Sequence, residues 1–325
     1  MKILIAGGGG FIGSALIPFL LKKGIECDVV DLFWYGNFLP KSVRWKKENL
    51  FHLTADDLTG YKQIICLAGI SSDPMAEFSP AANFIYNSAL PVYLAYQARL
   101  AKVKRFIFAS SCSVYHNTKR FATERFIPIT KSAYGLSKLQ AESGLLQLID
   151  INFSIIILRL GTVSGISPRM RFDLAVNTMF ATSMVQSRIR INDPNAWRPI
   201  VHINDACDAF YKSIIANEKI NGIFNIASFN MSVGRLGLQV KKYLEKMAKK
   251  KISLVTRNRE EVRNYRVSLQ KAKKVLRFNP RYSLEDIVSD LYSNRLQFQN
   301  FSNEDYQNLK IFKKISKLNQ FKFWM

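Results

Sequence analysis

The chain has 325 residues, 48% of them hydrophobic, which is enough for one large α/β unit or two modest domains with a substantial core. No apolar run is long enough to span a bilayer and no signal peptide pattern is present, so we expect a cytoplasmic protein without an integral membrane segment. The net charge of +23 is not accompanied by a helix-turn-helix, zinc-finger or RNA-binding signature, and we expect no nucleic-acid partner.

The excess of basic residues lies mostly late in the chain, at 246–251, 271–281 and 310–322. Three interpretations stay open: a solvated basic surface, a positive field that favours a phosphorylated substrate, and loose attachment to an acidic membrane face. In residues 297–325, aromatic residues alternate loosely with lysines, among them Phe301, Phe312, Phe321, Phe323 and Trp324. We expect this basic C-terminal tail to pack on the body of the protein.

The four cysteines carry no metal-binding pattern. Cys27, Cys66, Cys112 and Cys207 are scattered along the chain without the spacing of metal ligands. They are typical of the buried thiols of a cytosolic protein, and we predict no metal site.

In chain order, the first feature is a glycine-rich turn between a predicted strand at 3–6 and a predicted helix at 14–23. The glycines stand at positions 7, 10 and 13. This order places backbone N–H groups and a helix N-terminus against a pyrophosphate. Gly7 permits a tight turn, Gly10 lets the backbone approach the phosphates, and Gly13 lets the helix pack on the strand.

An acidic residue, Asp31, ends the next predicted strand, at 28–31. A carboxylate at this distance hydrogen-bonds the adenosine ribose hydroxyls and repels a 2′-phosphate, which favours NAD over NADP. The alternative, a glycine-rich loop followed by a solvated aspartate, does not account for the strand and helix that flank the motif.

Further strands and helices alternate along the first half of the chain. Strands are predicted at 63–67, 105–109 and 153–158, and helices at 80–101 and 132–148. Beyond residue 160 we predict a helix within 169–190, a return to the sheet at 197–202, a helix at 205–217 and a strand at 222–227. The pattern predicts an α/β fold with a doubly wound parallel sheet of the Rossmann type and a smaller C-terminal domain.

A second motif, Tyr134-Gly-Leu-Ser-Lys138, places a tyrosine and a lysine on one face at the start of a predicted helix. An ammonium beside a phenol lowers the pKa of the phenol, as a general acid/base requires. Such pairs also occur by chance. Here, however, Ser111 follows the strand at 105–109, at the carboxyl edge where open α/β sheets bind ligands. Ser111 can therefore hold a substrate oxygen while Tyr134 moves its proton.

Together these motifs resemble the extended short-chain dehydrogenase/reductase superfamily, and within it the NAD-dependent nucleotide-sugar epimerases and dehydratases. The resemblance covers about residues 1–295 and rests on six segments: the glycines at 7, 10 and 13, Asp31, Cys66-Leu-Ala-Gly69, Ser110-Ser-Cys-Ser-Val-Tyr115, Tyr134-Gly-Leu-Ser-Lys138, and Trp197-Arg-Pro-Ile-Val-His-Ile-Asn-Asp205. It implies a NAD-binding domain at 1–165, to which 199–228 return, a substrate-binding domain at 166–198 and 229–296, and the tail at 297–325.

The resemblance also assigns roles to single residues. It implies catalysis by Ser111, Tyr134 and Lys138, with Tyr134 and Lys138 also contacting the cofactor. The other implied cofactor contacts are Gly7, Gly10, Phe11, Ile12, Gly13, Asp31, Asn49, Leu67 and Ala68. Asn87 resembles an asparagine that supports the backbone near the cofactor. Ser113, Asn177 and Arg198 match substrate-binding positions, the last two at the diphosphate, with Arg169, Arg171 and Arg263 as weaker candidates for the same contact.

Several positions depart from the pattern of the family. The sugar 4,6-dehydratases carry an Asp-Glu pair where this chain has Cys112 and Ser113, so elimination of water is disfavoured. His116 replaces a usual glycine, Leu90-Pro91 a usual Gly-Thr, and Thr162 a frequent asparagine. These differences leave the identity of the sugar open.

We therefore predict an isomerase: a NAD-dependent epimerase of a nucleoside diphosphate sugar that forms a transient keto-sugar, with Tyr134 as acid/base. A keto-sugar reductase dependent on NAD(P)H is the first alternative, and a dinucleotide-sensing protein without catalysis is the second. Relatives pair the helices at 80–101 and 132–148 across a two-fold axis, and both helices carry apolar residues on more than one side. We accordingly expect a homodimer.

Overall fold

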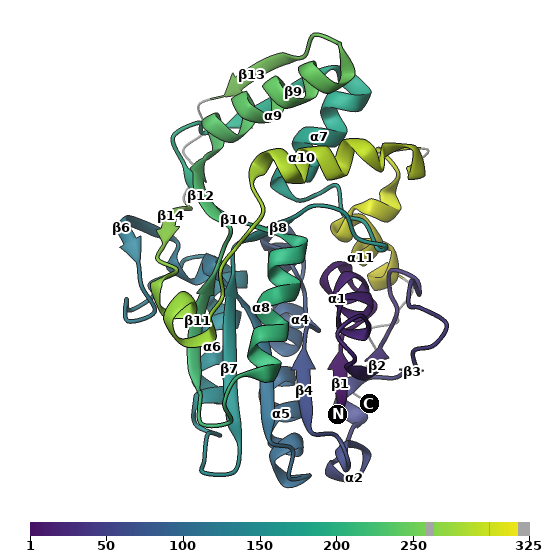
Figure 1. Ribbon diagram of the computed structural model, residues 1–325, viewed down its shortest axis with the longest axis vertical. Coiled ribbons are helices and arrows are strands. Elements are labelled where there is room, and N and C mark those ends of the chain that lie inside the picture. Colours follow the sequence, from purple (N-terminus) through teal and green to yellow (C-terminus); the bar gives the residue numbers. More distant parts are fainter. Residues whose placement is uncertain (258–262, 299, 318–325) are drawn as a thin grey trace.

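The computed structural model describes residues 1–257, 263–298 and 300–317, and its larger part is built on a seven-stranded sheet (Figure 1). Every pairing in this sheet is parallel, and the strand order is β11-β7-β5-β4-β1-β2-β3. The strands are β1 (Lys2–Ala6), β2 (Glu26–Asp31), β3 (Trp45–Lys47), β4 (Gln63–Cys66), β5 (Arg105–Ser111), β7 (Ser154–Leu160) and β11 (Gly222–Ile226). The predicted doubly wound parallel sheet is confirmed.

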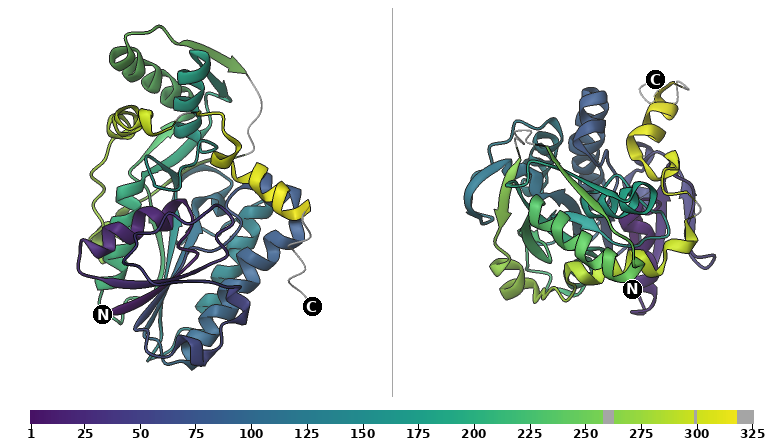
Figure 2. Two further views of the ribbon diagram at one scale, coloured as in Figure 1. Left: turned by 90° about the vertical axis from the view of Figure 1, so that its right-hand side faces the viewer. Right: turned by 90° about the horizontal axis from the view of Figure 1, so that it is seen from above.

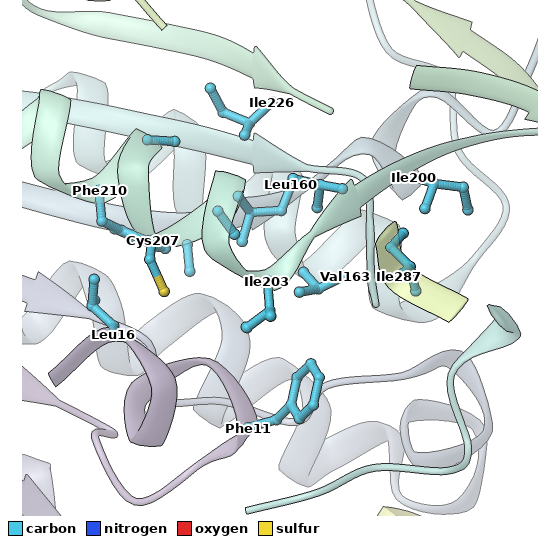
Figure 3. Packing of buried hydrophobic residues seen from close by; sticks show 14 of the residues in the cluster. Phe11, Leu16, Leu160, Val163, Ile200, Ile203, Cys207, Phe210, Ile226 and Ile287 are labelled. Carbon is cyan, nitrogen blue, oxygen red and sulfur yellow. The ribbon is translucent and has the colours of Figure 1, made fainter. Parts of the chain in front are cut away.

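Helices cover both faces of the sheet, which is why its central strands are buried on both faces and mostly apolar. On one face lie α1 (Phe11–Leu21) and α8 (Ile203–Ile215), and on the other lie α2 (Ala55–Leu58), α4 (Pro80–Phe84), α5 (Leu90–Leu100) and α6 (Ala133–Leu146). Alternate residues of each strand enter two separate cores: Ile3 and Ile5 pack with α1 and α8, whereas Leu4 and Ala6 pack with α5 and α6. Figure 3 shows part of the first core, where Cys207 and Phe210 of α8 face Leu16 of α1.

The predicted helix at 80–101 is interrupted. It consists of α4, a π-helical stretch at Ile85–Ala89 and α5. All four cysteines are free and buried, as expected. None of the helices in the described part of the chain is long and apolar enough to cross a membrane.

The smaller part of the molecule lies above the carboxyl ends of the large sheet (Figure 1). It contains β8 (Thr162–Ser164), α7 (Ala175–Gln186), β9 (Arg188–Asn192), β10 (Trp197–His202), β12 (Phe229–Ser232), α9 (Val233–Ala248), β13 (Ser253–Arg257) and α10 (Leu284–Ser293). The strand expected at 197–202 is present, but as β10 it pairs with β8 and β12 rather than with the large sheet. A further pair, β6 (Asn117–Ala122) with β14 (Asn264–Val267), joins the two parts.

One prediction in this region is wrong in part. The helix expected within 169–190 spans only α7, because Ser187 adopts a left-handed conformation (φ 50°) and ends it. Residues 188–192 then form β9, in which Ile189 and Ile191 are buried while Arg188 and Arg190 are exposed. This alternation has the period of a strand and is visible in the sequence.

The C-terminal segment packs on the body, as expected for the residues that the structure describes. It contains helix α11 (Asn308–Lys317), which packs against α3 (Asp73–Phe78) (Figure 2). Phe312 of α11 is fully buried, and its ring centre lies 5.8 Å from that of Trp34 and 6.0 Å from that of Phe78. Phe321, Phe323 and Trp324 lie outside the described residues.

Candidate functional site

The glycine-rich turn connects β1 to α1 at the carboxyl edge of the sheet. Gly7 has a φ of +87°, and a Cβ there would overlap the backbone nitrogen of Ala68. A Cβ on Gly13 would overlap the backbone of Gly8, so both positions require glycine for packing. At Gly10 the nearest heavy atom would lie 3.7 Å away, which is ordinary contact. The glycine at position 10 therefore leaves space beside the first turn of α1 that the protein itself does not fill.

That first turn presents backbone N–H groups without an acidic side chain to compete for them. α1 begins at Phe11 and Ile12, and its first turn contains no acidic residue. A helix N-terminus with free space beside it is an anion-binding arrangement. The turn thus fits the pyrophosphate of a dinucleotide.

Asp31 ends β2 next to this turn. Its Oδ2 accepts a hydrogen bond from the N–H of Gly9 (2.9 Å) and its Oδ1 accepts one from the N–H of Phe33 (2.6 Å). Burial raises the pKa of the Asp31 carboxyl, while these two N–H groups act in the opposite direction. The carboxylate is therefore fixed at the position from which it reaches ribose hydroxyls in dinucleotide-binding folds.

Asn49, Leu67 and Ala68 complete the set of expected cofactor contacts. The Asn49 side chain is 4% exposed, and its Oδ1 accepts from the N–H of Phe51 (3.1 Å). Its Nδ2 is buried and has no hydrogen-bond partner among the residues described. Leu67 and Ala68 follow β4, and both donate their N–H to the carbonyl of Ala6, at 2.8 and 3.1 Å. A buried amide donor without a partner fits an acceptor on an adenine, so these residues suit NAD.

Ser111 and Tyr134 lie together at the end of β5. Tyr134 is in the first turn of α6, which is capped by Ser132, whose Oγ accepts from the N–H of Gly135 (3.0 Å). Ser111 lies near enough to the Tyr134 hydroxyl to act against the rise in the pKa of the phenol. Ser111 Oγ also accepts from the N–H and the Oγ of Ser113, at 3.2 and 2.9 Å. The serine hydroxyl is thereby oriented toward the phenol.

Lys138 follows Tyr134 by one helical turn. Its Nζ donates to the carbonyl oxygen of Ala109 (3.0 Å) and lies 6.0 Å from the centre of the Tyr134 ring. Burial lowers the pKa of Lys138 to about 8. The structure therefore brings together the three residues expected to be catalytic.

One expectation about this site is not met in the ligand-free protein. Burial and the Asp73 carboxylate raise the pKa of Tyr134 to about 12, although Ser111 and Arg171 act in the opposite direction. The Lys138 ammonium was expected to lower this pKa, but it is not among the charges that set it. Its Nζ is directed to the carbonyl of Ala109, so the charged groups that bear on the hydroxyl are Asp73 and Arg171.

Two asparagine side chains, Asn87 and Asn83, connect the loop after β4 to the start of α6 through hydrogen bonds. Asn87 Nδ2 donates to the carbonyl of Ile70 (2.8 Å) and to Oδ1 of Asn83 (2.7 Å), and Asn83 Nδ2 donates to the carbonyl of Ala133 (2.9 Å). The loop after β4 is thereby tied to the start of α6. That this backbone lies near the cofactor, as expected for Asn87, stays a prediction. The sequence analysis missed Asn83, although a second asparagine four residues before Asn87 lies on the same helical face.

Asp73 is a further residue at this site whose role was not predicted from the sequence. One carboxylate oxygen of Asp73 accepts from Ser132, and the other pairs with Nη1 of Arg263 at 2.6 Å. These contacts link the loop after β4 to the residues that lead into β14. Asp73 lies in the segment Ser71-Ser-Asp-Pro, where the order of residues alone gives no sign of a partner 190 positions away.

Asn177 and Arg198 are the two residues expected at the substrate diphosphate. The Asn177 amide is fully buried and bonds to both backbone groups of Gly165 (3.0 and 3.2 Å) and to the carbonyl of Arg171 (2.9 Å). It therefore shapes the loop at 165–171. Arg198 is 8% exposed, and its Nη1 donates to the carbonyls of Trp197 and Arg263. Contact of Asn177 or Arg198 with a diphosphate stays a prediction.

Comparison with known proteins agrees with this geometry. A model of the NAD dependent epimerase/dehydratase family matches residues 3–227. An uncharacterized UDP-glucose epimerase of Bacillus subtilis (strain 168), YtcB, is 30% identical over 88% of this chain and 95% of that protein. The UDP-glucose 4-epimerase of Yersinia enterocolitica is 24% identical over 90% and 96%. The crystal structure of UDP-glucuronic acid 4-epimerase from Bacillus cereus, in complex with UDP-glucuronic acid and NAD, has a TM-score of 0.80 at 25% identity and covers 91% of this chain and 99% of that one.

The chain belongs to the NAD-dependent epimerase/dehydratase family. The family, the fold class and the NAD cofactor expected from the sequence are thereby confirmed. The relatives also agree with the expectation of a NAD-dependent sugar epimerase, an isomerase.

Proposed function

We propose that this chain is a NAD-dependent 4-epimerase of a UDP-hexose or a UDP-hexuronic acid. The observation that carries the proposal is the placement of Ser111, Tyr134 and Lys138 at the carboxyl edge of the parallel sheet, beside the glycine-rich turn. The substrate class comes from the relatives, whose names specify UDP-glucose and UDP-glucuronic acid.

In this proposal, Tyr134 is the general base and then the general acid. Its phenolate accepts the proton of the sugar 4-hydroxyl, and the Ser111 hydroxyl, held by Ser113, donates a hydrogen bond to the same sugar oxygen. When bound, the nicotinamide of NAD supplies a reversible hydride acceptor, and its positive charge favours the phenolate. The 4-keto sugar turns over in the pocket, and Tyr134 returns the proton to the oxygen of the inverted carbon.

The residues next to Ser111 support epimerisation over elimination of water. Ser113 donates its hydroxyl to Ser111, and the Cys112 thiol donates to the carbonyl of Arg159 (3.1 Å). Burial raises the pKa of the Cys112 thiol far above its ordinary value, so this group stays protonated. Neither side chain supplies the second acid and base that a dehydratase needs.

The test is turnover of UDP-glucose, UDP-galactose and UDP-glucuronic acid, followed by NMR, together with nicotinamide absorbance. An epimerase interconverts the 4-epimers without a sustained change in absorbance, because its cofactor is restored in each cycle. Tyr134→Phe should lower turnover by roughly 10²–10⁴-fold. The matched control is Tyr211→Phe, on α8 at the opposite face of the sheet. Oxidation of NADH in proportion to product would establish the reductase instead, and full activity of Tyr134→Phe would exclude both enzymes.

We also propose a homodimer that pairs α5 and α6 with the same helices of a second copy. Several large apolar side chains on α4, α5 and α6 are exposed: Phe84, Tyr96, Leu100 and Leu136. The two longer helices pack against each other, and in this proposal the exposed apolar residues meet those of the second copy. Light scattering should give twice the chain mass, and the double variant Tyr96→Lys, Leu136→Lys should give the monomer mass. A monomer for the unaltered chain would refute the pairing.

A cytoplasmic location is likewise a proposal. It is supported by the four buried, free cysteines, which are typical of a reducing compartment. Fractionation of cells that express the tagged chain would test it, and recovery with the membrane fraction would count against it.

A further inference from the structure

Three arginines are among the largest fully buried side chains of the described residues: Arg105, Arg159 and Arg169. Arg105 has a complete set of acceptors, since it donates to Ser154 Oγ and, at 2.7–2.8 Å, to three backbone carbonyls. The second pairs with the carboxylate of Glu142. Both therefore follow the rule that a buried guanidinium is satisfied by acceptors.

Arg169 is the exception. Its side chain is 2% exposed, and Nη1 and Nη2 are both buried without a hydrogen-bond partner in the part of the chain that the structure describes. The ring of Tyr35 lies 4.0 Å from the guanidinium carbon. A nearby acid, Asp173, is already engaged by Arg171 through two hydrogen bonds, at 2.8 and 3.1 Å. Burial and the positive charge of Arg171 lower the pKa of Arg169 to about 10, although Tyr35, Asp173 and Asp305 act in the opposite direction.

The contacts of the loop around Arg169 indicate which anion this side chain would bind. Its backbone N–H donates to Ser14 Oγ (3.2 Å), and the neighbouring Ser167 donates its hydroxyl to the carbonyl of Phe11 (2.6 Å). Both acceptors belong to the first turn of α1, whose N-terminus faces the space left by Gly10. The loop that carries Arg169 is thus fastened to the anion-binding turn.

Arg169 also lines a cavity of about 760 Å³. The walls of this cavity come from three parts of the chain: the loop after β2 with Trp34 and Tyr35, the loop at 166–170, and the C-terminal segment with Phe298 and Tyr306. A guanidinium offers a fork of N–H donors that matches two phosphate oxygens.

We propose that Arg169 binds the diphosphate of the NAD cofactor, on the side opposite the N–H groups of the α1 turn. This inference rests on the proposed function only through its cofactor, since it makes no use of the sugar. Such a contact serves an epimerase, because an enzyme that restores its cofactor in each cycle gains from holding it tightly. The nucleoside diphosphate of the substrate is the other source of the same chemical group, but the contacts with Ser14 and Phe11 favour the cofactor.

The test uses the full-length chain and measures binding rather than turnover. NAD and UDP are titrated separately by calorimetry into the unaltered chain, Arg169→Met and Arg169→Lys, and thermal unfolding is recorded with and without NAD. We expect Arg169→Met to weaken NAD binding by roughly 10- to 100-fold, the worth of one or two charge-assisted hydrogen bonds, and to leave UDP binding unchanged. Arg169→Lys keeps the charge but loses the fork, so its effect should be smaller.

Stability separates this role from a structural one. Without NAD, Arg169→Met removes a buried charge whose Nη1 and Nη2 have no hydrogen-bond partner among the described residues, so the melting temperature should stay the same or rise. The matched control is Arg105→Met, which leaves the buried carbonyl of Ser213 and the part-buried carbonyls of Ala216 and Asn217 without their donor and should lower the melting temperature. If Arg169→Met and Arg169→Lys both bind NAD as the unaltered chain does, the inference is wrong. If they lose affinity for UDP alone, the anion belongs to the substrate and the assignment to the cofactor fails.

Discussion

The carboxylate of Asp73 pairs with the guanidinium of Arg263 at 2.6 Å, and the two residues come from the two parts of the molecule. The second carboxylate oxygen of Asp73 accepts from Ser132, which caps the helix that begins beside Tyr134. The same carboxylate raises the pKa of Tyr134. The contact that joins the two parts therefore also bears on the protonation of the proposed acid/base.

Two substitutions at this pair should shift the pH dependence of turnover in opposite directions. The phenolate of Tyr134 is the active form, so activity falls as the pH drops through its pKa. Asp73→Asn removes a negative charge, lowers that pKa and moves the acid limb of the kcat profile to lower pH. Arg263→Gln leaves the Asp73 charge without its partner, raises the pKa of Tyr134 and moves the limb to higher pH. Shifts in the same direction would contradict the electrostatic explanation.

Lys138 should set the alkaline limb of activity. Burial holds its pKa at about 8 in the ligand-free protein, so its ammonium loses its proton as the pH rises above that value. Activity should decline there, because Lys138, which we propose contacts the cofactor, loses its charge. Lys138→Met should lower activity at neutral pH and abolish this limb of the kcat profile. A variant that keeps the same alkaline limb would assign the limb to another group.

The same pKa has a consequence for stability. The folded-state pKa of Lys138 lies below the ordinary value of 10.5, so the unfolded chain binds more protons between these two values. The contribution of Lys138 to the free energy of unfolding therefore increases from about pH 8 to pH 10.5. Comparing the unaltered chain with Lys138→Met by denaturant unfolding across this range isolates the effect.

The parts of the site that follow from local order were predictable from the sequence. The glycines at 7, 10 and 13 and the pair Tyr134 and Lys138 are spaced by the geometry of one turn and one helix, and their places in the structure agree with that spacing. The same holds for the parallel sheet, whose strands are short apolar runs separated by helices.

The remaining features depend on contacts between distant segments. No spacing rule connects Asp73 with Arg263, or Arg169 with the first turn of α1. The direction of the pKa shift of Tyr134 was also beyond reach, because it depends first on the burial of the hydroxyl and then on the charge of Asp73. The spacing of Tyr134 and Lys138 indicated that the lysine would lower this pKa, whereas in the folded chain burial and the Asp73 carboxylate raise it.

The buried ion pair between Glu142 and Arg159 should contribute more to the free energy of unfolding than an exposed pair does. Glu142 on α6 accepts three hydrogen bonds from Arg159, with both side chains no more than 2% exposed. Glu142→Ala leaves the Arg159 charge buried without its carboxylate and should lower the free energy of unfolding by about 3–5 kcal/mol. The control is Glu218→Gln at the exposed pair with Lys62, where the loss should be below about 1 kcal/mol. Equal losses in denaturant unfolding would show that burial does not decide the cost.

The C-terminal segment should contribute to the stability of the NAD-binding part of the molecule. Phe312 is fully buried in the core that also contains residues of α5 and α6, and Asn308 donates its amide to Ser71 (2.7 Å) in the loop after β4. Phe312→Ala should lower the free energy of unfolding by about 3–5 kcal/mol, because it leaves a cavity in a packed core. The control, Lys317→Ala, removes an exposed side chain of the same helix and should have little effect. Denaturant unfolding measures both, and a Phe312→Ala chain as stable as its control would show that α11 does not hold this core together.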